Sequence, residues 1–96
     1  MKNMSIESIP VSVALEKRGF TYYDGQEPCY IAKVRKNTYA VVDMNYEAQM
    51  WTVNEDITDD EFIRQMTGSE SDFDDLCDKS RYQEMPLFWA LGFTED

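Results

Sequence analysis

The 96-residue sequence contains no histidine, and this absence removes a large part of ordinary enzyme chemistry. Serine and cysteine nucleophiles activated by an imidazole are excluded, and so are metal sites with histidine ligands. The two cysteines, Cys29 and Cys77, form neither a CxxC pair nor a metal-type spacing. We interpret both as core residues that stay reduced in a cytoplasmic compartment.

Basic residues are also scarce, with nine Lys and Arg against nineteen Asp and Glu, for a net charge of -10. Direct binding to nucleic acid needs a basic footprint, and so does attraction to an anionic membrane surface. No apolar run reaches the length of a signal-peptide core or of a membrane span. The sequence therefore predicts a cytoplasmic protein that contacts neither nucleic acid nor membrane directly.

Glycine is limited to four residues, and no glycine-rich loop that could hold a phosphate is present. An EF-hand loop counted from Asn54 would need Gly and Glu where Asp59 and Gln65 stand. Carboxylates on the outer side of capped helices keep near-normal pKa values, which suits acid-base catalysis poorly. We predict no catalytic residues, no metal and no cofactor, and hence a protein that is not an enzyme.

What the sequence does contain is enough apolar material for a core: 43% hydrophobic and 14% aromatic residues. These are globular values, above those of a disordered acidic tail. The length fits one domain, so residues 1–96 are predicted to form a single domain.

The first half of the chain predicts one helix followed by strands. Pro10 stands near the start of a helix over residues 9–18, with Ser8 as a candidate cap and Gly19 as its stop. The following segments are rich in β-branched and aromatic residues and predict a three- to four-stranded antiparallel meander. They read FTYYDG, CYIAKVR, TYAVVDM and QMWTV.

Lys36-Asn37 predicts a two-residue hairpin turn, because Asn tolerates a positive φ. Arg35 would then pair with Thr38. This register predicts two sets of side chains on opposite faces. One face would hold Tyr30, Ala32, Val34, Tyr39 and Val41, and the other Ile31, Ala40 and Val42 beside Lys33 and Arg35.

The second half predicts helices. Thr58 to Glu61 matches a capping box that opens a helix ending at Gly68, and Ser69 or Ser71 caps the next helix, which Pro86 stops. The LFWALGF segment predicts a short apolar turn or helix packed on the core. The inward side chains would be Phe62, Ile63, Met66, Phe73, Leu76 and Cys77. The fold class is therefore α+β, in the order α-β-β-β-α-α, with the helices against one face of the sheet.

Charge is divided unevenly along the chain. Residues 1–53 carry six acids and six bases, whereas residues 54–96 carry thirteen acids and three bases. Acids in first helical turns are favoured by the helix dipole, which accounts for about half of the cluster in residues 54–78. The remaining acids in residues 54–78 are more than helix capping requires. Two such helices would form an acidic edge of roughly 30 Å, with a charge density approaching that of duplex DNA.

The acids concentrated in NEDITDDEFIRQ and SESDFDDLCDKS, in a chain of this length and order, resemble small acidic inhibitors encoded by phages and mobile elements. These include DNA-mimicking anti-restriction proteins and some anti-CRISPR proteins. The resemblance implies a basic nucleic-acid-binding partner in the host cell, such as a Cas effector complex or a restriction enzyme, blocked where DNA or RNA would lie.

Two other functions fit the same charge pattern: an immunity protein or antitoxin that neutralises a basic nuclease toxin, and a plain acidic protein-interaction domain.

Affinity for a partner protein would need desolvated aromatic anchors, for which Tyr46 and Tyr82 are candidates, while Trp51 and Trp89 are expected in the core. The predicted partner-binding residues are Glu55, Asp56, Asp59, Asp60, Glu70, Asp72, Asp74, Asp75, Asp78, Tyr46 and Tyr82.

Overall fold

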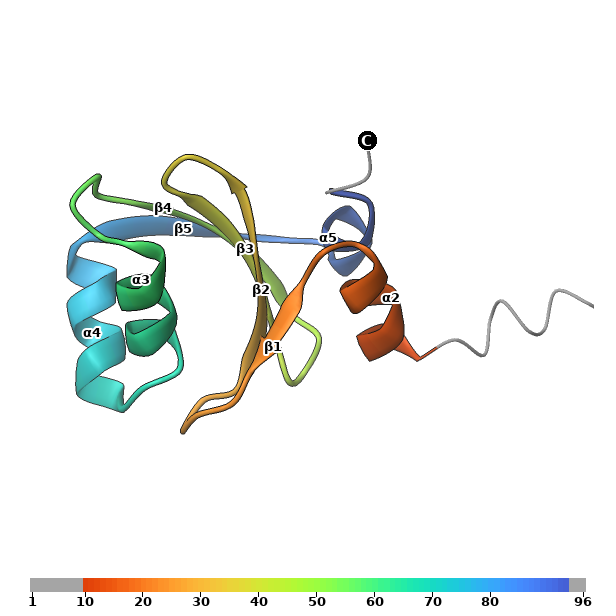
Figure 1. Ribbon diagram of the computed structural model, residues 1–96, viewed down its shortest axis with the longest axis horizontal. Helices are drawn as coiled ribbons and strands as arrows, with labels where there is room; N and C mark the ends of the chain where they lie inside the picture. Colours follow the sequence, from red (N-terminus) through yellow and green to blue (C-terminus); the bar gives the residue numbers. More distant parts are fainter. Residues whose placement is uncertain (1–9, 94–96) are drawn as a thin grey trace, which may run out of the picture.

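The computed structural model describes residues 10–93, and the predicted cap Ser8 lies outside this range. The described residues form an α+β fold with one five-stranded antiparallel sheet and four helices (Figure 1). The strands lie in chain order, β1-β2-β3-β4-β5, and helices α3 and α4 are inserted between β4 and β5. The predicted α+β class is confirmed, but the sheet has five strands where three or four were expected.

The first helix, α2 (Val11–Lys17), begins after Pro10, whose carbonyl accepts bonds from the N–H groups of Val13 and Ala14. Gly19 ends it with a φ of 99°, a conformation that glycine adopts without strain. Leu15 is completely buried on the inner side of the helix. The stop at Gly19 is therefore the one that the sequence predicts, whereas the N-cap is Pro10 itself and the helix is shorter than the predicted range 9–18.

Four of the strands match predicted segments: β1 (Thr21–Tyr23), β2 (Cys29–Arg35), β3 (Thr38–Asp43) and β4 (Ala48–Val53). The fifth, β5 (Ser80–Met85), replaces the expected continuation of a helix to Pro86. It pairs with β4, and Tyr82 stacks on Trp51 with ring centroids 4.5 Å apart. The hydrogen bonds that this segment gains at the open edge of β4, together with the cover that it provides for Trp51, outweigh the helical preference of its own sequence.

The register of β2 against β3 also differs from the prediction. Asn37 has the expected positive φ of 60°, and Arg35 pairs with Thr38, but Lys33 then pairs with Tyr39. A β-bulge at Val34 takes up the extra residue, and every side chain beyond it changes face. Ile31 therefore shares a face with Tyr39 and Val41. Tyr30 and Ala32 lie on the opposite face with Ala40 and Val42.

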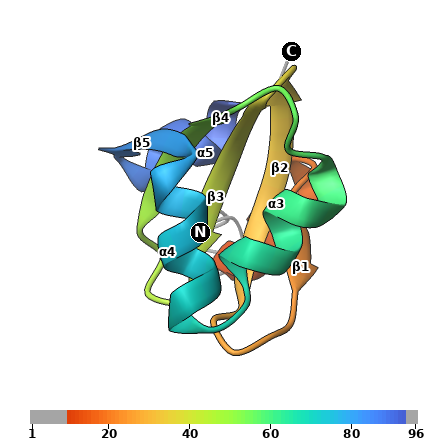
Figure 2. The same cartoon turned by 90° about the vertical axis from the view of Figure 1, so that its left-hand side faces the viewer.

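Helices cover both faces of the sheet, which corrects the prediction of a single covered face (Figures 1 and 2). Helices α3 (Asp59–Met66) and α4 (Glu70–Asp78) pack side by side on one face, and α2 and α5 (Leu87–Phe93) pack on the other. Four consecutive residues of β2 and five of β3 are buried, alternating between the two faces. A sheet whose central strands are apolar on both faces needs two covering layers.

The core under α3 and α4 is built from aromatic rings. Trp51 and Phe62 are completely buried, Phe62 stacks on Tyr39 at 4.0 Å, and Phe73 meets Trp51 edge-on at 5.7 Å. The six side chains predicted to face inward from these helices are all buried or half-buried against this core. Trp89 is the exception among the predicted core tryptophans, because 55% of it is exposed on α5.

Phe62 should therefore be a main determinant of stability. Replacing it with alanine removes the ring that stacks on Tyr39, and we expect Phe62→Ala to lower the free energy of unfolding by about 3–5 kcal/mol. Phe88→Ala is the matched control, since Phe88 is 67% exposed, and it should change stability by less than about 0.5 kcal/mol. Urea unfolding followed by circular dichroism measures both. Equal effects of the two substitutions would contradict this account of the core.

Candidate acidic interaction surface

Helix α4 presents a row of carboxylates to solvent. Phe73, Leu76 and Cys77 occupy the i, i+3 and i+4 positions that face the core, so the intervening positions point outward. Four exposed acids of this helix form no hydrogen bond or ion pair within residues 10–93. We call them the α4 ridge. Glu70, Asp74 and Asp78 follow one another at i, i+4 and i+8 along one side of the helix, and Asp75 lies on the neighbouring side.

The ridge is fixed to the fold at both ends of the helix. Ser69 and Asp72 form a full capping box at the N-terminal end, with the Asp72 N–H bonded to the Ser69 Oγ at 3.3 Å. At the other end, the Lys79 carbonyl accepts a bond from the Asn54 N–H at 3.2 Å. This bond brings the exposed residues Glu55 and Asp56 next to the C-terminal end of α4, so they extend the row of charge.

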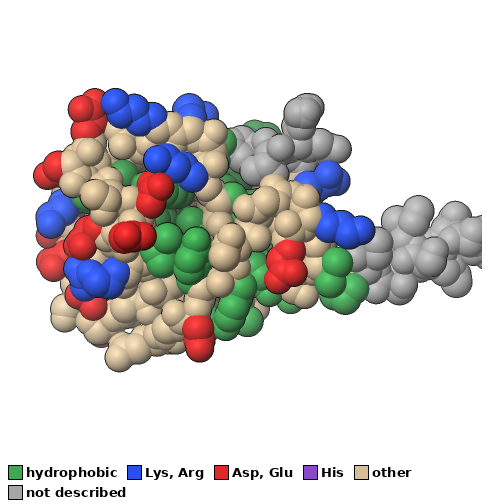
Figure 3. Space-filling model, viewed as in Figure 1, with side chains coloured by type: hydrophobic (Ala, Val, Ile, Leu, Met, Phe, Trp, Pro, Cys, Tyr) green, Lys and Arg blue, Asp and Glu red, His purple; other side chains and the backbone are tan. Residues whose placement is uncertain are grey.

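The acids of α3 are instead largely engaged within the protein. The Tyr39 hydroxyl donates to Asp59 Oδ1 at 2.6 Å, and Lys33 Nζ lies 3.1 Å from the same oxygen. Glu61 pairs with Arg64 at 2.7 Å and accepts a bond from Gln65. Asp60 is exposed and forms no such bond among the described residues. Figure 3 shows acidic and basic side chains next to one another at this end of the molecule.

These contacts shift the pKa values of the acids involved. The hydrogen bond from Tyr39, and then the contact with Lys33, lowers the pKa of Asp59, while burial and Asp59 raise the pKa of the Tyr39 hydroxyl. Bonds from Ser69, and then Arg64, lower the pKa of Asp72. Asp59 and Asp72 therefore belong to the internal bonding of the fold, and only part of each carboxylate is free for a partner.

The two predicted tyrosine anchors lie apart from each other. Tyr82 is on β5, half exposed, and covers Trp51 on the same sheet face as α4. Tyr46 is in the turn between β3 and β4, with a φ of 61°. This turn precedes Ala48, whereas the connection to α3 follows Val53. A strand of six residues, about 20 Å long, separates Tyr46 from the acids.

The geometry also shortens the acidic edge. Because α3 and α4 lie side by side, they do not form the roughly 30 Å edge that two helices placed end to end would give. The ridge on α4 spans about 12 Å at a rise of 1.5 Å per residue. The structure thus brings together Glu70, Asp74, Asp75 and Asp78 with Glu55 and Asp56, leaves Asp60 exposed on α3, and engages Asp59 and Asp72 in bonds within the protein.

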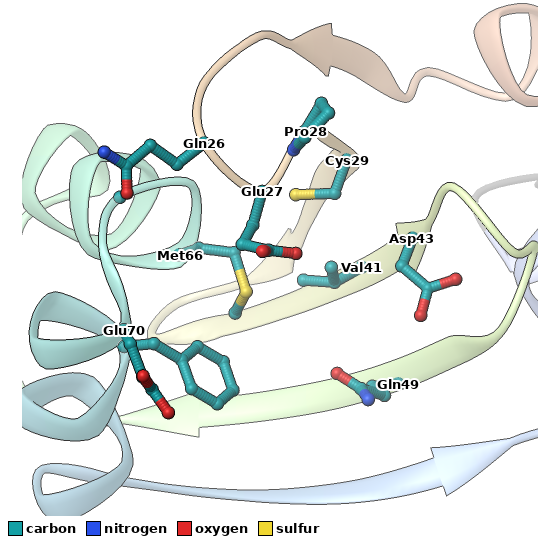
Figure 4. Close-up of a pocket in the computed structure, with 11 residues that line it drawn as sticks. Gln26, Glu27, Pro28, Cys29, Val41, Asp43, Gln49, Met66 and Glu70 are labelled. Carbon is teal, nitrogen blue, oxygen red and sulfur yellow. The ribbon is translucent and has the colours of Figure 1, made fainter.

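A cavity of about 390 Å³ lies beside the N-terminal end of α4, and the sequence analysis did not anticipate it (Figure 4). It is bounded by the β1–β2 turn, the α3–α4 connection, and β2, β3 and β4. Burial, followed by Asp43 and Glu27, raises the pKa of the Cys29 thiol at its floor to about 12. Cys29 is thus protonated at neutral pH and is a poor nucleophile.

A signal for this cavity is present in the strand sequences. Along the face that α3 and α4 cover, side chains change from apolar to polar: Tyr39 and Val41 lead to Asp43 on β3, and Val53 and Trp51 lead to Gln49 on β4. The polar positions mark the end of the face that the helices do not cover. This pattern can be recognised only once the register of the strands, and hence the face of each side chain, is known.

Comparisons with protein-family models, curated proteins and solved structures give no match for this chain. Among residues 10–93, no helix has the length and apolar character needed to cross a membrane. In the same residues, no group of three or more Asp, Glu or Cys side chains is placed to hold a metal ion. A functional proposal for this chain therefore rests on its own geometry and charge.

Asp59 should make stability depend on pH. Because its pKa is lowered in the folded state, its contribution is present above the pKa of unfolded aspartate, about 3.9, and is lost as the pH falls through the folded-state pKa. Asp59→Asn keeps an acceptor for Tyr39 but removes the charge that attracts Lys33. We expect the loss of unfolding free energy to be largest at neutral pH and to vanish once the pH is below the folded-state pKa of Asp59.

The control for this experiment is Asp60→Asn, which removes a neighbouring charge from the same helical turn without breaking an ion pair. Urea unfolding between acid and neutral pH compares the two variants with the wild type. A constant difference between Asp59→Asn and the wild type across this range would contradict the assigned role of Asp59.

Proposed function

We propose that this protein is a non-enzymatic inhibitor that acts in the host-cell cytoplasm. Its acidic helical surface would imitate nucleic acid and occupy the DNA- or RNA-binding site of a basic host defence protein or complex. The observation that carries this proposal is the α4 ridge: four exposed carboxylates, three of them in an i, i+4, i+8 row, without ion pairs among residues 10–93, on a helix whose two ends are fixed.

The number of charges over the length of the ridge supports imitation of one phosphate strand. Over about 12 Å, a single DNA strand with one phosphate every 3.4 Å carries about four charges, and the ridge has the same number. A duplex would carry about twice as many in this length. Glu55 and Asp56 continue the row beyond Asp78. A basic groove that holds one strand would thus be attracted by the ridge through the same electrostatics.

The fixed backbone of α4 adds to this argument. A ridge on a capped helix, anchored by Leu76 and Phe73, loses little conformational freedom when it binds. An acidic tail that served solubility alone would need no such order. Charge of this kind mainly raises the association rate and selects basic partners.

Charge reversal on the ridge tests the proposal. The triple variant Asp74→Lys, Asp75→Lys and Asp78→Lys should reduce capture of a basic nucleic-acid-binding protein from host lysate at least tenfold at low salt. The matched control is Glu16→Lys, Asp24→Lys and Glu47→Lys, which changes the net charge equally at exposed sites on α2 and in two turns. This control should retain capture.

Pull-down with mass spectrometry at low and high salt measures the effect, and duplex or single-stranded nucleic acid is added as a competitor. Supporting results are capture that weakens as salt rises and is displaced by nucleic acid. Capture that survives ridge reversal would contradict the proposal. Capture of a nuclease toxin alone would overturn the host-defence target in favour of an immunity protein.

A further inference from the structure

The cavity beside α4 is a preformed site with fixed walls. Glu27 donates its N–H to the Thr67 carbonyl at 3.2 Å, which ties the β1–β2 turn to the end of α3. Gly25 approaches Thr67 so closely that an added Cβ would lie 2.5 Å from the Thr67 carbonyl oxygen. With a volume of about 390 Å³, the cavity falls in the range of small-ligand sites.

The charge of the cavity is entirely negative. Its walls include Glu27, Asp43 and Glu70, and none of its lining residues is Lys or Arg. Figure 4 shows Glu70 on the helical side and Asp43 with Gln49 on the sheet side, with Glu27 from the turn between them. Within residues 10–93, the carboxylates of Glu27 and Glu70 form no hydrogen bond or ion pair. Asp43 uses one oxygen, Oδ1, to accept the Asn45 and Glu47 N–H groups.

The floor of the cavity is apolar. It is formed by Cys29 and Val41 of the sheet, Met66 of α3 and Phe73 of α4. The raised pKa of Cys29 reports the same environment, since both burial and the nearby carboxylates disfavour a negative charge there. A group that fits needs a positive head for the rim and an apolar or planar stem for the floor.

We propose that this cavity binds an arginine side chain of the basic partner protein. A guanidinium group is planar, weakly hydrated and able to pair with two carboxylates while its stem packs on an aromatic ring. Lysine is less suited, because its ammonium group is compact and strongly hydrated. The inference rests on the proposed function, and it adds the anchor that a charged ridge alone does not provide.

The assignment can be tested on the protein alone with a small probe, acetyl-arginine-methylamide. Titration is followed by NMR of the Met66 methyl group, which lines the cavity. Saturable shifts of this signal are expected at low salt. The matched probes are acetyl-citrulline-methylamide, which has the same shape without the charge, and acetyl-lysine-methylamide. Both should bind at least fivefold more weakly, and equal binding of either would overturn the choice of arginine.

Variants identify the site. Glu27→Gln combined with Glu70→Gln should weaken binding of the arginine probe at least tenfold, while Asp60→Asn combined with Asp75→Asn removes two exposed acids outside the cavity lining and should leave it within twofold. Asp43→Asn provides a further check, because it keeps an oxygen that can accept the turn N–H groups. Unchanged affinity in the Glu27 and Glu70 variant would overturn the inference.

The two proposals fail in different ways. The ridge reversal leaves Glu27 and Glu70 intact, and the cavity variant leaves Asp74, Asp75 and Asp78 intact. Capture of a basic partner without binding of the arginine probe would overturn the cavity assignment and leave the proposed function standing. Probe binding without salt-dependent capture of a nucleic-acid-binding protein would overturn the proposed function.

Discussion

The burial of β3 on both faces is the constraint on which the rest of this structure depends. Successive side chains of a strand point to opposite faces, so Val41 and Val42 require two separate apolar covers. On one face, α3 and α4 provide 8 and 9 residues of helix, packed side by side at one end of the strands (Figure 1). Strands of 6 and 7 residues extend about 20–23 Å, whereas helices of 8 and 9 residues are only about 12–14 Å long. The outward row of α4 and the open cavity beside it both follow from this incomplete cover.

The fold also decides which of the acids can serve another purpose. An acid at a helix N-terminus is stabilised by the dipole and by free N–H groups whether or not a partner exists. Asp72 completes the Ser69 capping box, and Asp59 bonds Tyr39 and Lys33, so their presence is explained by the fold. Asp74, Asp75 and Asp78 occupy the middle and end of α4, where a negative charge gains nothing from the dipole. Their location is the reason to seek an explanation outside the fold.

Local patterns in the sequence predict helix ends and turns well in this protein. They fail where contacts with segments distant in the sequence determine the structure. Pro10, Gly19, Thr58 and Ser69 mark helix ends through bonds to nearby backbone, and Asn37 marks a turn through its own φ. The predicted box at Thr58 is half right, because Glu61 bonds Arg64 and Gln65. Ser80–Met85 has no strong strand pattern of its own and becomes a strand because β4 offers an edge. The bulge at Val34 reverses the facing of β2, so the polar end of the covered face and its cavity could not be located from the sequence.

The ridge and the cavity complement each other physically, because exposed charge and contact inside a cavity contribute to different parts of binding. Exposed carboxylates attract a basic surface over about a Debye length, yet water and salt screen them in the complex and limit their share of the affinity. The cavity is partly sheltered from water, so a cation held there meets carboxylates at a lower effective dielectric constant than on the ridge and gains contact with the apolar floor. Glu70 belongs to both features, as the first residue of α4 and as part of the cavity wall. A basic partner drawn to the ridge would therefore bring its side chains within reach of the cavity, and steering and anchoring would act in one encounter.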